Sequence, residues 1–304
     1  MEDKNNTNDV TIFIDKGKIF LKENKYDQAL ASFDISNSIK PTREAYYSKG
    51  NVLFKLGNYQ EALDTYNQAI ELDPKNSTIH FLKGNTLTKI GNFTQALDAY
   101  NLALQQDPVN RTFYIAKADL LFELGDYEQA KKEYDKAIVI LPTASLYISK
   151  GNALFKLGNY QEALDAYNHA IELDPQSYDN LLVDKGVELF NANVPNMSLY
   201  YFDAAIKLDN ESSKAYYSKG NALLKLGNYY EALDAYNDAI DLDDENFFTY
   251  YSKGNVLFEL GNYDKALDAY NKAKLFMPDK KKYSDALGYK INVTNKYTSN
   301  LISK

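Results

Sequence analysis

Residues 46–74 read YYSKGNVLFKLGNYQEALDTYNQAIELDP, and close copies of this stretch recur along the chain. The tripeptide KGN alone begins at Lys49, Lys83, Lys150, Lys219 and Lys253. Alignment on its glycine, or on the residue in its place, gives steps of 33 to 35 residues. Self-similarity at such a period is the signature of a repeat architecture. We therefore divide the chain into eight repeats, over residues 10–42, 43–76, 77–110, 111–143, 144–178, 179–212, 213–246 and 247–279.

Glycine and proline support this alignment independently. Counted from the first residue of each repeat, 13 of the 14 glycines occupy position 8 or 15, and 6 of the 7 prolines occupy position 32. Glycine tolerates the left-handed conformation that ends a helix, and proline stops a helix. The second repeat thus predicts helices over about 44–56 and about 60–72, separated at Gly57. Asn24 and Asn193 replace glycine at position 15 in two repeats, and asparagine also tolerates that conformation.

Apolar residues form one face of each predicted helix pair. In the second repeat, Tyr46, Leu53, Tyr66 and Ala69 recur at helical spacing around Gly50, which is small where the two helices cross. One pair cannot bury such a face alone, but neighbouring pairs stacked on it can. The sequence therefore predicts an all-α solenoid of antiparallel helix pairs.

The two ends of the chain depart from the repeat. Residues 280–304 place apolar residues on one side of a predicted helix, so we expect this helix to cap the last repeat. Those residues are Tyr283, Leu287, Ile291, Tyr297 and Leu301. Residues 1–9 are polar and acidic; we expect a disordered tail, and they lack the apolar core of a signal peptide.

The pattern resembles the tetratricopeptide repeat (TPR) family. The shared features are an aromatic residue at position 4, glycine or alanine at 8, alanine at 20, an aromatic residue at 24 and proline at 32. The resemblance covers residues 10 to 280. It implies a right-handed superhelical solenoid in which the first helix of each pair lines a concave groove. It also implies a scaffold that binds other proteins and catalyses no reaction.

Composition and charge narrow the function further. The net charge of −8 repels phosphate backbones, so we expect neither a nucleic acid nor an anionic membrane as partner. No apolar run is long enough to span a bilayer, and the absence of cysteine fits a reducing, cytoplasmic location. His80 and His169 lie in different repeats, and no metal-ligand cluster, phosphate-binding loop or Ser/His/Asp arrangement is apparent. We therefore expect no catalytic residue, metal or cofactor.

Position 9 provides the main candidate for peptide binding. It carries asparagine in five repeats, at Asn51, Asn85, Asn152, Asn221 and Asn255. A side-chain amide has donors and an acceptor, so it can pair with the C=O and N–H of an extended peptide. Some proteins of the resembled family use such asparagine ladders. The alternative is that these residues serve helix capping or solubility and persist through repeat duplication.

Aromatic residues at positions 5 and 12 flank the predicted groove. At position 5, Tyr47, Phe81, Tyr217 and Tyr251 are candidates for binding anchors, although the neighbouring repeat could cover them. The phenylalanines at position 12 fit packing better than binding. They are Phe54, Phe122, Phe155, Phe190 and Phe258.

Lysine recurs at two positions of the first helix. At position 13, Lys55, Lys89, Lys156 and Lys225 could give the groove a basic lining for an acidic peptide segment. Position 7 is lysine in all eight repeats, and two interpretations remain open for it. Its ammonium group either pairs with a nearby Asp or Glu, or adds to the basic lining.

The sixth repeat is irregular, with Leu182 at position 4, Pro195 near the start of its second helix and Ser198 at position 20. We expect it to fold with a changed turn, by neutral drift or as a local hinge.

A monomer or weak homo-oligomer that binds a peptide is our principal hypothesis. A self-associating structural solenoid is the alternative, and a helical-repeat RNA reader fits the acidic charge poorly. The sequence does not identify the partner protein.

Overall fold

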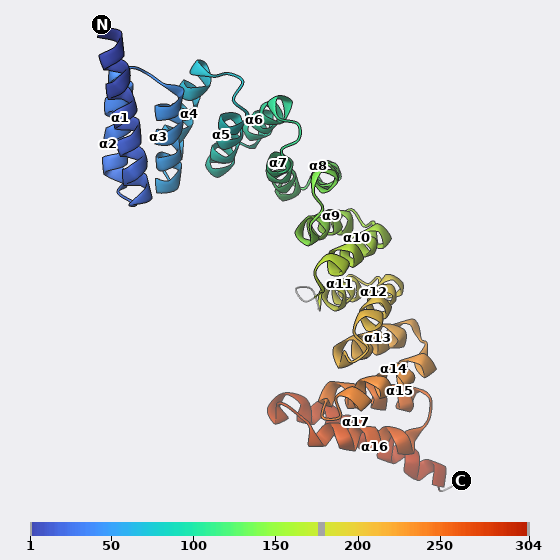
Figure 1. Ribbon diagram of the computed structural model, residues 1–304. Coiled ribbons are helices and arrows are strands. Elements are labelled where there is room, and N and C mark those ends of the chain that lie inside the picture. Colours follow the sequence, from blue (N-terminus) through green and yellow to red (C-terminus); the bar gives the residue numbers. More distant parts are fainter. Residues whose placement is uncertain (1, 176–179, 303–304) are drawn as a thin grey trace. The chain divides into compact units, whose positions relative to one another are not determined.

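The computed structural model describes residues 2–175 and 180–302, and its side chains over 9–175, 180–279 and 282–299. The described residues form helices and short connections, with no β-strand (Figure 1). Residue contacts divide the chain into an N-terminal body, residues 1–166, and a C-terminal body, residues 167–304.

The N-terminal body contains nine complete helices among the described residues. They are α1 (Glu2–Lys22), α2 (Tyr26–Ile39), α3 (Arg43–Leu56), α4 (Tyr59–Leu72), α5 (Ser77–Ile90), α6 (Phe93–Gln106), α7 (Arg111–Glu123), α8 (Tyr127–Ile140) and α9 (Ala144–Lys156). The division between the bodies falls within α10 (Tyr160–Leu173).

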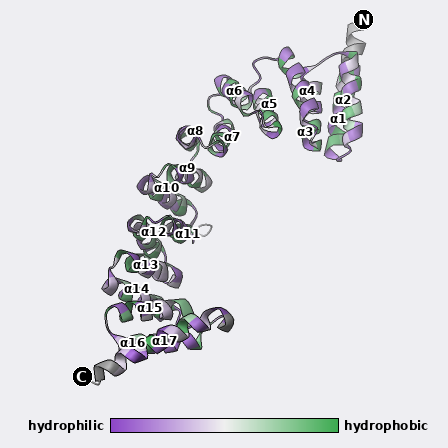
Figure 2. Ribbon diagram, turned by 180° about the vertical axis from the view of Figure 1, so that it is seen from behind, coloured by the Kyte–Doolittle hydropathy of each residue, from purple (hydrophilic) through white to green (hydrophobic). Residues whose placement is uncertain are grey.

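The C-terminal body continues the same pattern of paired helices. It contains α11 (Leu181–Asn191), α12 (Pro195–Leu208), α13 (Ser213–Leu226), α14 (Tyr229–Leu242), α15 (Phe247–Glu259), α16 (Tyr263–Leu275) and α17 (Lys280–Ile302). Within each body, successive helices pack against one another, and each helix mixes hydrophobic with hydrophilic residues (Figure 2). The prediction of consecutive antiparallel helix pairs is confirmed.

A left-handed residue ends the first helix of a pair, as predicted. Gly57 has φ of 83°, its N–H donates to the carbonyl of Phe54, and the N–H of Asn58 donates to that of Leu53. These bonds satisfy carbonyl groups that the end of the helix leaves open. Asn24 and Asn193 adopt the same conformation, with φ of 58° and 64°.

Glycine at position 8 lies where the two helices of a pair cross. A Cβ atom on Gly50 would come within 2.6 Å of the ring of Tyr66, which is fully buried. The small residue at position 8 and the ring at position 24 therefore form one packing unit. This contact sets the distance between the helices and places the tyrosine hydroxyl beside position 9.

The N-terminus differs from the prediction. Helix α1 begins at Glu2, so residues 2–9 are helical where the sequence predicts a disordered tail. Val10 and Ile14 are buried against Ala45 and anchor this helix. The sequence has neither proline nor glycine before Gly17, so nothing interrupts the helix on the N-terminal side of this anchor.

Helix α17, which the sequence predicts as a cap, packs against the last repeat. Leu287 is 1% exposed and joins a core cluster with Phe247, Tyr250 and Leu257. The ring centroid of Tyr283 lies 5.1 Å from that of Phe247. Of the five predicted capping residues, Leu301 lies outside the described side chains.

The sixth repeat keeps the paired-helix arrangement. Pro195 occupies the first turn of α12, where a missing N–H costs no helical hydrogen bond. Ser198 is fully buried at the position of the usual alanine, and its hydroxyl donates to the carbonyl of Pro195 at 2.7 Å. Residues 176–179 of the preceding connection lie outside the described part of the chain.

Candidate functional site

The position-9 asparagines are held by tyrosines of the second helix in the same repeat. In the N-terminal body, the hydroxyl groups of Tyr66 and Tyr100 donate to the Oδ1 atoms of Asn51 and Asn85 at 2.8 Å. The same bond recurs in the C-terminal body, from Tyr236 to Asn221 at 2.8 Å and from Tyr270 to Asn255 at 2.9 Å. In the fourth repeat, Asp119 replaces asparagine and accepts from Tyr134 at 2.6 Å.

Burial makes these tyrosines permanent donors. The Tyr66 side chain has no exposed surface, and this burial raises the pKa of its hydroxyl far above the ordinary value for tyrosine. A buried hydroxyl without a partner is costly, so Oδ1 at position 9 satisfies a group that the fold itself creates.

The repeats without a position-24 hydroxyl support this interpretation. Positions 24 of the first and sixth repeats are Phe33 and Phe202, and their positions 9 are Lys18 and Val187. Every repeat with tyrosine at position 24 has asparagine or aspartate at position 9. Position 9 therefore has a structural role, as acceptor for the buried tyrosine hydroxyl. The sequence interpretations, which were peptide binding and capping or solubility, did not include this role.

The tyrosine bond also orients each amide. Because Oδ1 faces the hydroxyl, Nδ2 points away from it and remains available as a donor. In the described part of the chain, the Nδ2 groups of Asn51, Asn85, Asn221 and Asn255 have no hydrogen-bond partner. These residues are partly exposed, as is Asn152 at the same position of α9. The geometry thus gives a row of oriented donors in each body.

The aromatic residues at position 5 pack on the same tyrosines. The ring centroids lie 5.9 Å apart for Phe81 and Tyr100, and 5.9 Å apart for Tyr251 and Tyr270. Tyr217 lies 6.2 Å from Tyr236 in the same way. Each position-5 ring is partly buried, as is that of Tyr47. Positions 5, 9 and 24 therefore form one cluster, which we call the 5–9–24 cluster.

A hollow of about 290 Å³ lies beside this cluster in the N-terminal body. It is lined by the position-5 residue Tyr47 and the position-6 residue Ser48, together with residues of α1 and α5. Lys18 and Glu44 form an ion pair at its edge. The small side chain of Ser48 leaves this part of the surface open.

The other predicted groove residues contact their neighbours. Lys55 lies 5.2 Å from the ring centroid of Tyr26, and Lys225 lies 4.6 Å from that of Phe190, each ring belonging to the preceding repeat. Both lysines are exposed, as are Lys89 and Lys156.

Four of the five phenylalanines at position 12 pack at the turn of their own repeat. The ring of Phe54 meets that of Tyr59 edge-on at 5.3 Å, and Phe122, Phe155 and Phe258 repeat this contact with the tyrosine five residues onward. The packing interpretation of position 12 therefore fits the structure.

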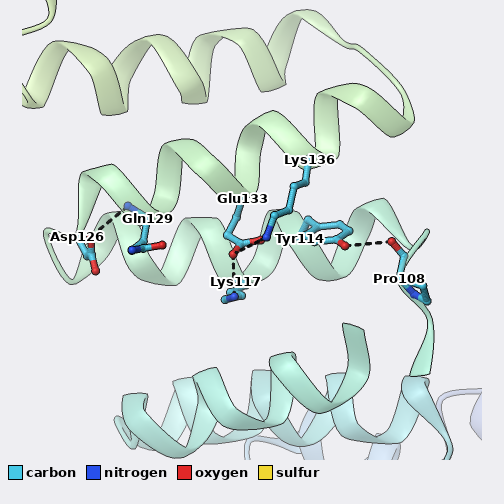
Figure 3. Close-up of polar contacts among 7 residues, drawn as sticks. All are labelled: Pro108, Tyr114, Lys117, Asp126, Gln129, Glu133 and Lys136. Atoms are coloured by element: carbon cyan, nitrogen blue, oxygen red, sulfur yellow. Dashed lines mark hydrogen bonds and ion pairs between the residues drawn. The ribbon is translucent and has the colours of Figure 1, made fainter. Parts of the chain in front are cut away.

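Four of the eight lysines at position 7 pair with carboxylates of second helices. Lys150 reaches Asp135 at 2.6 Å and Lys219 reaches Asp203 at 2.7 Å, each across a repeat boundary, and Lys49 pairs with Asp34 in the same way. These three aspartates occupy position 25, where the other repeats carry asparagine. Lys117 instead binds Glu133 of its own repeat (Figure 3). Ion pairing, rather than a basic lining, accounts for these four lysines.

Replacing Lys219 by methionine tests how much such a pair contributes. Both partners are partly exposed, so we expect the free energy of unfolding to fall by less than about 1 kcal/mol. The loss should disappear in 1 M NaCl, where screening removes the attraction in the parent as well. Urea unfolding followed by circular dichroism measures both. A loss that persists in high salt would indicate packing by the lysine stem instead.

The described residues hold no group of three His, Asp or Glu side chains placed to bind a metal ion. Among the helices of that part of the chain, none is both long and apolar enough to cross a bilayer.

Comparisons with known sequences identify related repeats. Three family models, each described as "Tetratricopeptide repeat", match residues 44–76 and 144–177, residues 91–148, and residues 65–98. A model described as "Anaphase-promoting complex, cyclosome, subunit 3" matches residues 196–273. The small glutamine-rich tetratricopeptide repeat-containing protein 2 of Mycosarcoma maydis is 31% identical over 75 residues. That match spans 24% of this chain and 21% of the relative.

Solved structures share the fold at low sequence identity. A chain in the structure of Naa15/Naa10 bound to HypK-THB aligns with a TM-score of 0.61 and 17% identity, over 88% of this chain and 42% of that one. The C-terminal part of a TPR repeat-containing protein from Cytophaga hutchinsonii aligns with a TM-score of 0.57 and 17% identity, over 79% and 98% of the two chains.

Proposed function

Because the chain belongs to the tetratricopeptide repeat family, we propose that it is a non-catalytic scaffold that binds an extended segment of a partner protein. The observation that supports this proposal is the oriented amide of the 5–9–24 cluster. A buried tyrosine fixes Oδ1 of each asparagine and leaves Nδ2 as a donor at a partly exposed position.

An extended peptide matches these donors chemically. Its backbone carbonyls recur at regular intervals and accept hydrogen bonds whatever the side chains are, so such contacts give affinity with relaxed sequence preference. An amide already fixed by Tyr66 or Tyr236 loses little side-chain entropy on binding. The partly exposed rings at position 5 add apolar contact area beside each donor. Hydrogen bonds from peptide N–H groups to Oδ1 contribute less to binding, because Oδ1 already accepts a hydrogen bond from the tyrosine hydroxyl.

The partner that fits best is an acidic segment. The exposed ammonium groups of Lys55, Lys89, Lys156 and Lys225 lie at position 13, on the same helices as the amides. Charge complementarity of this kind speeds association and favours acidic over basic partners. We place the protein in the cytoplasm, as a monomer or weak homo-oligomer, on the sequence properties given above.

Substitution of asparagine by aspartate tests the amide donors without disturbing the fold. Asn51, Asn85, Asn221 and Asn255 are replaced together, because Asp119 shows that a carboxylate accepts the tyrosine bond equally well. Each replacement removes a donor and places a negative charge against peptide carbonyls. We expect affinity for partners recovered from the native cell to fall by roughly tenfold or more, as loss of several hydrogen bonds predicts.

The matched control carries the same change on the second helices. Asn67, Asn101, Asn168 and Asn271 occupy position 25, where aspartate occurs naturally in three other repeats. Replacing these four by aspartate adds the same charge and should leave partner recovery unchanged. Circular dichroism should give the same helix content for all three proteins. If the position-9 variant and the position-25 control recover the same partners with equal affinity, the position-9 donors do not take part in partner binding.

A further inference from the structure

A cavity of about 380 Å³ in the C-terminal body concentrates positive charge in an otherwise acidic protein. It lies among α14, α15 and α16, and its lining includes Tyr250, Lys253, Lys265, Asp268, Ala269 and Lys272. Among the described lining residues, three are lysines and only Asp268 is acidic. This cavity is distinct from the 5–9–24 cluster.

The three lysines lack counterions within the described residues. None of Lys253, Lys265 and Lys272 takes part in an ion pair there. Lys253 is partly buried, and its pKa is lowered by this burial and by the charges of Lys272 and Lys265, although Asp241 opposes the shift. Its repeat follows one with Asn237 at position 25, so the aspartate that pairs with lysine at other boundaries is missing.

The fourth repeat shows how the protein satisfies a nearly identical arrangement. There Glu133 is only 4% exposed and accepts from Lys117 at 2.8 Å and from Lys136 at 3.0 Å (Figure 3). Lys136 also lies over the ring of Tyr114, 5.5 Å from its centroid. One carboxylate thus neutralises two lysines above a tyrosine.

The eighth repeat has the same residues except the carboxylate. Tyr250, Lys253 and Lys272 occupy the positions of Tyr114, Lys117 and Lys136, and Lys272 lies over Tyr250 at the same 5.5 Å. The position of Glu133 is taken by Ala269, which is small and lines the cavity. Lys265 adds a third positive charge at position 19, where the other repeats carry Glu, Gln or Met.

We infer that this cavity binds the carboxylate of an acidic side chain from a peptide, in the place that Glu133 occupies in the fourth repeat. Of the eight repeats, only the fourth carries a carboxylate at this position, and the eighth has the two lysines that bind it there without the carboxylate itself. Lys253 is partly buried and Lys272 is exposed, and hydrogen bonds from both ammonium groups to a carboxylate are charge-assisted, which makes them stronger than neutral ones. The site stands independently of the position-9 donors, because it uses neither those amides nor the position-5 rings.

Binding is measured by fluorescence anisotropy with a fluorescein-labelled hexaglutamate peptide and the full chain at low ionic strength. The Lys253→Gln/Lys272→Gln variant should raise the dissociation constant by roughly tenfold or more. The control is Lys75→Gln/Lys207→Gln, which removes the same charge at exposed sites and should change it less than about twofold. Equal weakening by both variants would show a general charge effect and overturn the assignment.

Ala269→Glu provides a second test that does not depend on loss of a lysine. The new side chain supplies the carboxylate internally, so peptide binding should fall by roughly tenfold or more while the melting temperature rises. Gln95→Glu adds the same charge at an exposed site and should do neither. Ala269→Glu that binds the peptide like the parent, with an unchanged melting temperature, would refute the site. Displacement of the peptide by inorganic phosphate at lower concentration than by free glutamate would reassign the cavity to phosphate.

Discussion

Replacing Leu287 by aspartate should lower the free energy of unfolding of the C-terminal body by about 4 kcal/mol, since it both empties an apolar site and buries a charge. Leu287 is 1% exposed and lies in the cluster formed by Phe247, Tyr250 and Leu257. Helix α17 also places Tyr283 against Phe247 and Tyr297 against Tyr263, with the latter centroids 5.0 Å apart. If α17 detaches, these rings become exposed to water together.

Tyr289 offers the matched control on the same helix. It is 68% exposed, so Tyr289→Asp introduces the same charge without disturbing the cluster and should change stability by less than about 0.5 kcal/mol. Urea unfolding followed by circular dichroism compares the two variants, and light scattering reports association of an uncovered last repeat. Equal stability of both variants would mean that α17 does not act as a cap.

Replacing Asn51 by alanine should cost about 2 kcal/mol, because the buried Tyr66 hydroxyl loses its acceptor at 2.8 Å. Replacing Tyr66 by phenylalanine removes the donor itself. The double variant Asn51→Ala/Tyr66→Phe leaves no unsatisfied hydroxyl and should recover more than half of the loss from the first change. The sixth repeat is the natural precedent, since Val187 and Phe202 occupy these two positions.

A double-mutant cycle on chemical unfolding gives the coupling between Asn51 and Tyr66. We expect a coupling of about 1–2 kcal/mol, in the range for directly bonded neighbours. Strict additivity of the two single changes would contradict the structural role of position 9. Asn51→Asp serves as the control, because it keeps an acceptor for the hydroxyl, as Asp119 does for Tyr134.

The paired helices could be predicted from the sequence because their signals are local. Glycine at position 15 and proline at position 32 act on the backbone where they stand, so the predicted ranges 44–56 and 60–72 lie within one residue of α3 and α4. The start of the chain carries no such local signal, and the prediction of disorder there differs from the structure. Polar composition suggested disorder over residues 1–9, but an uninterrupted helix anchored at Val10 and Ile14 extends back to Glu2.

The tyrosine partner of position 9 could not be read from one helix at a time. Asn51 and Tyr66 are 15 residues apart and lie on different helices, so helical periodicity does not relate them. The lysine at position 7 is a harder case, since Lys150 pairs with Asp135 of the preceding repeat. Both contacts can be recognised when the eight repeats are compared. Position 9 is asparagine or aspartate wherever position 24 is tyrosine, and the position-7 ion pairs across a boundary occur where position 25 is aspartate. Peptide binding at the amides stays a prediction.

The hydrogen bond between positions 9 and 24 has a consequence for growth of the array by duplication. Its donor and acceptor are encoded within one repeat, whereas the lysine–aspartate pairs need residues from two. A duplicated repeat therefore keeps this hydrogen bond wherever it is inserted, and its position-9 amide is already oriented by the tyrosine. Inserting a copy of residues 43–76 would add one more oriented amide donor. The ion pairs at the new junctions, by contrast, would depend on where the copy was inserted.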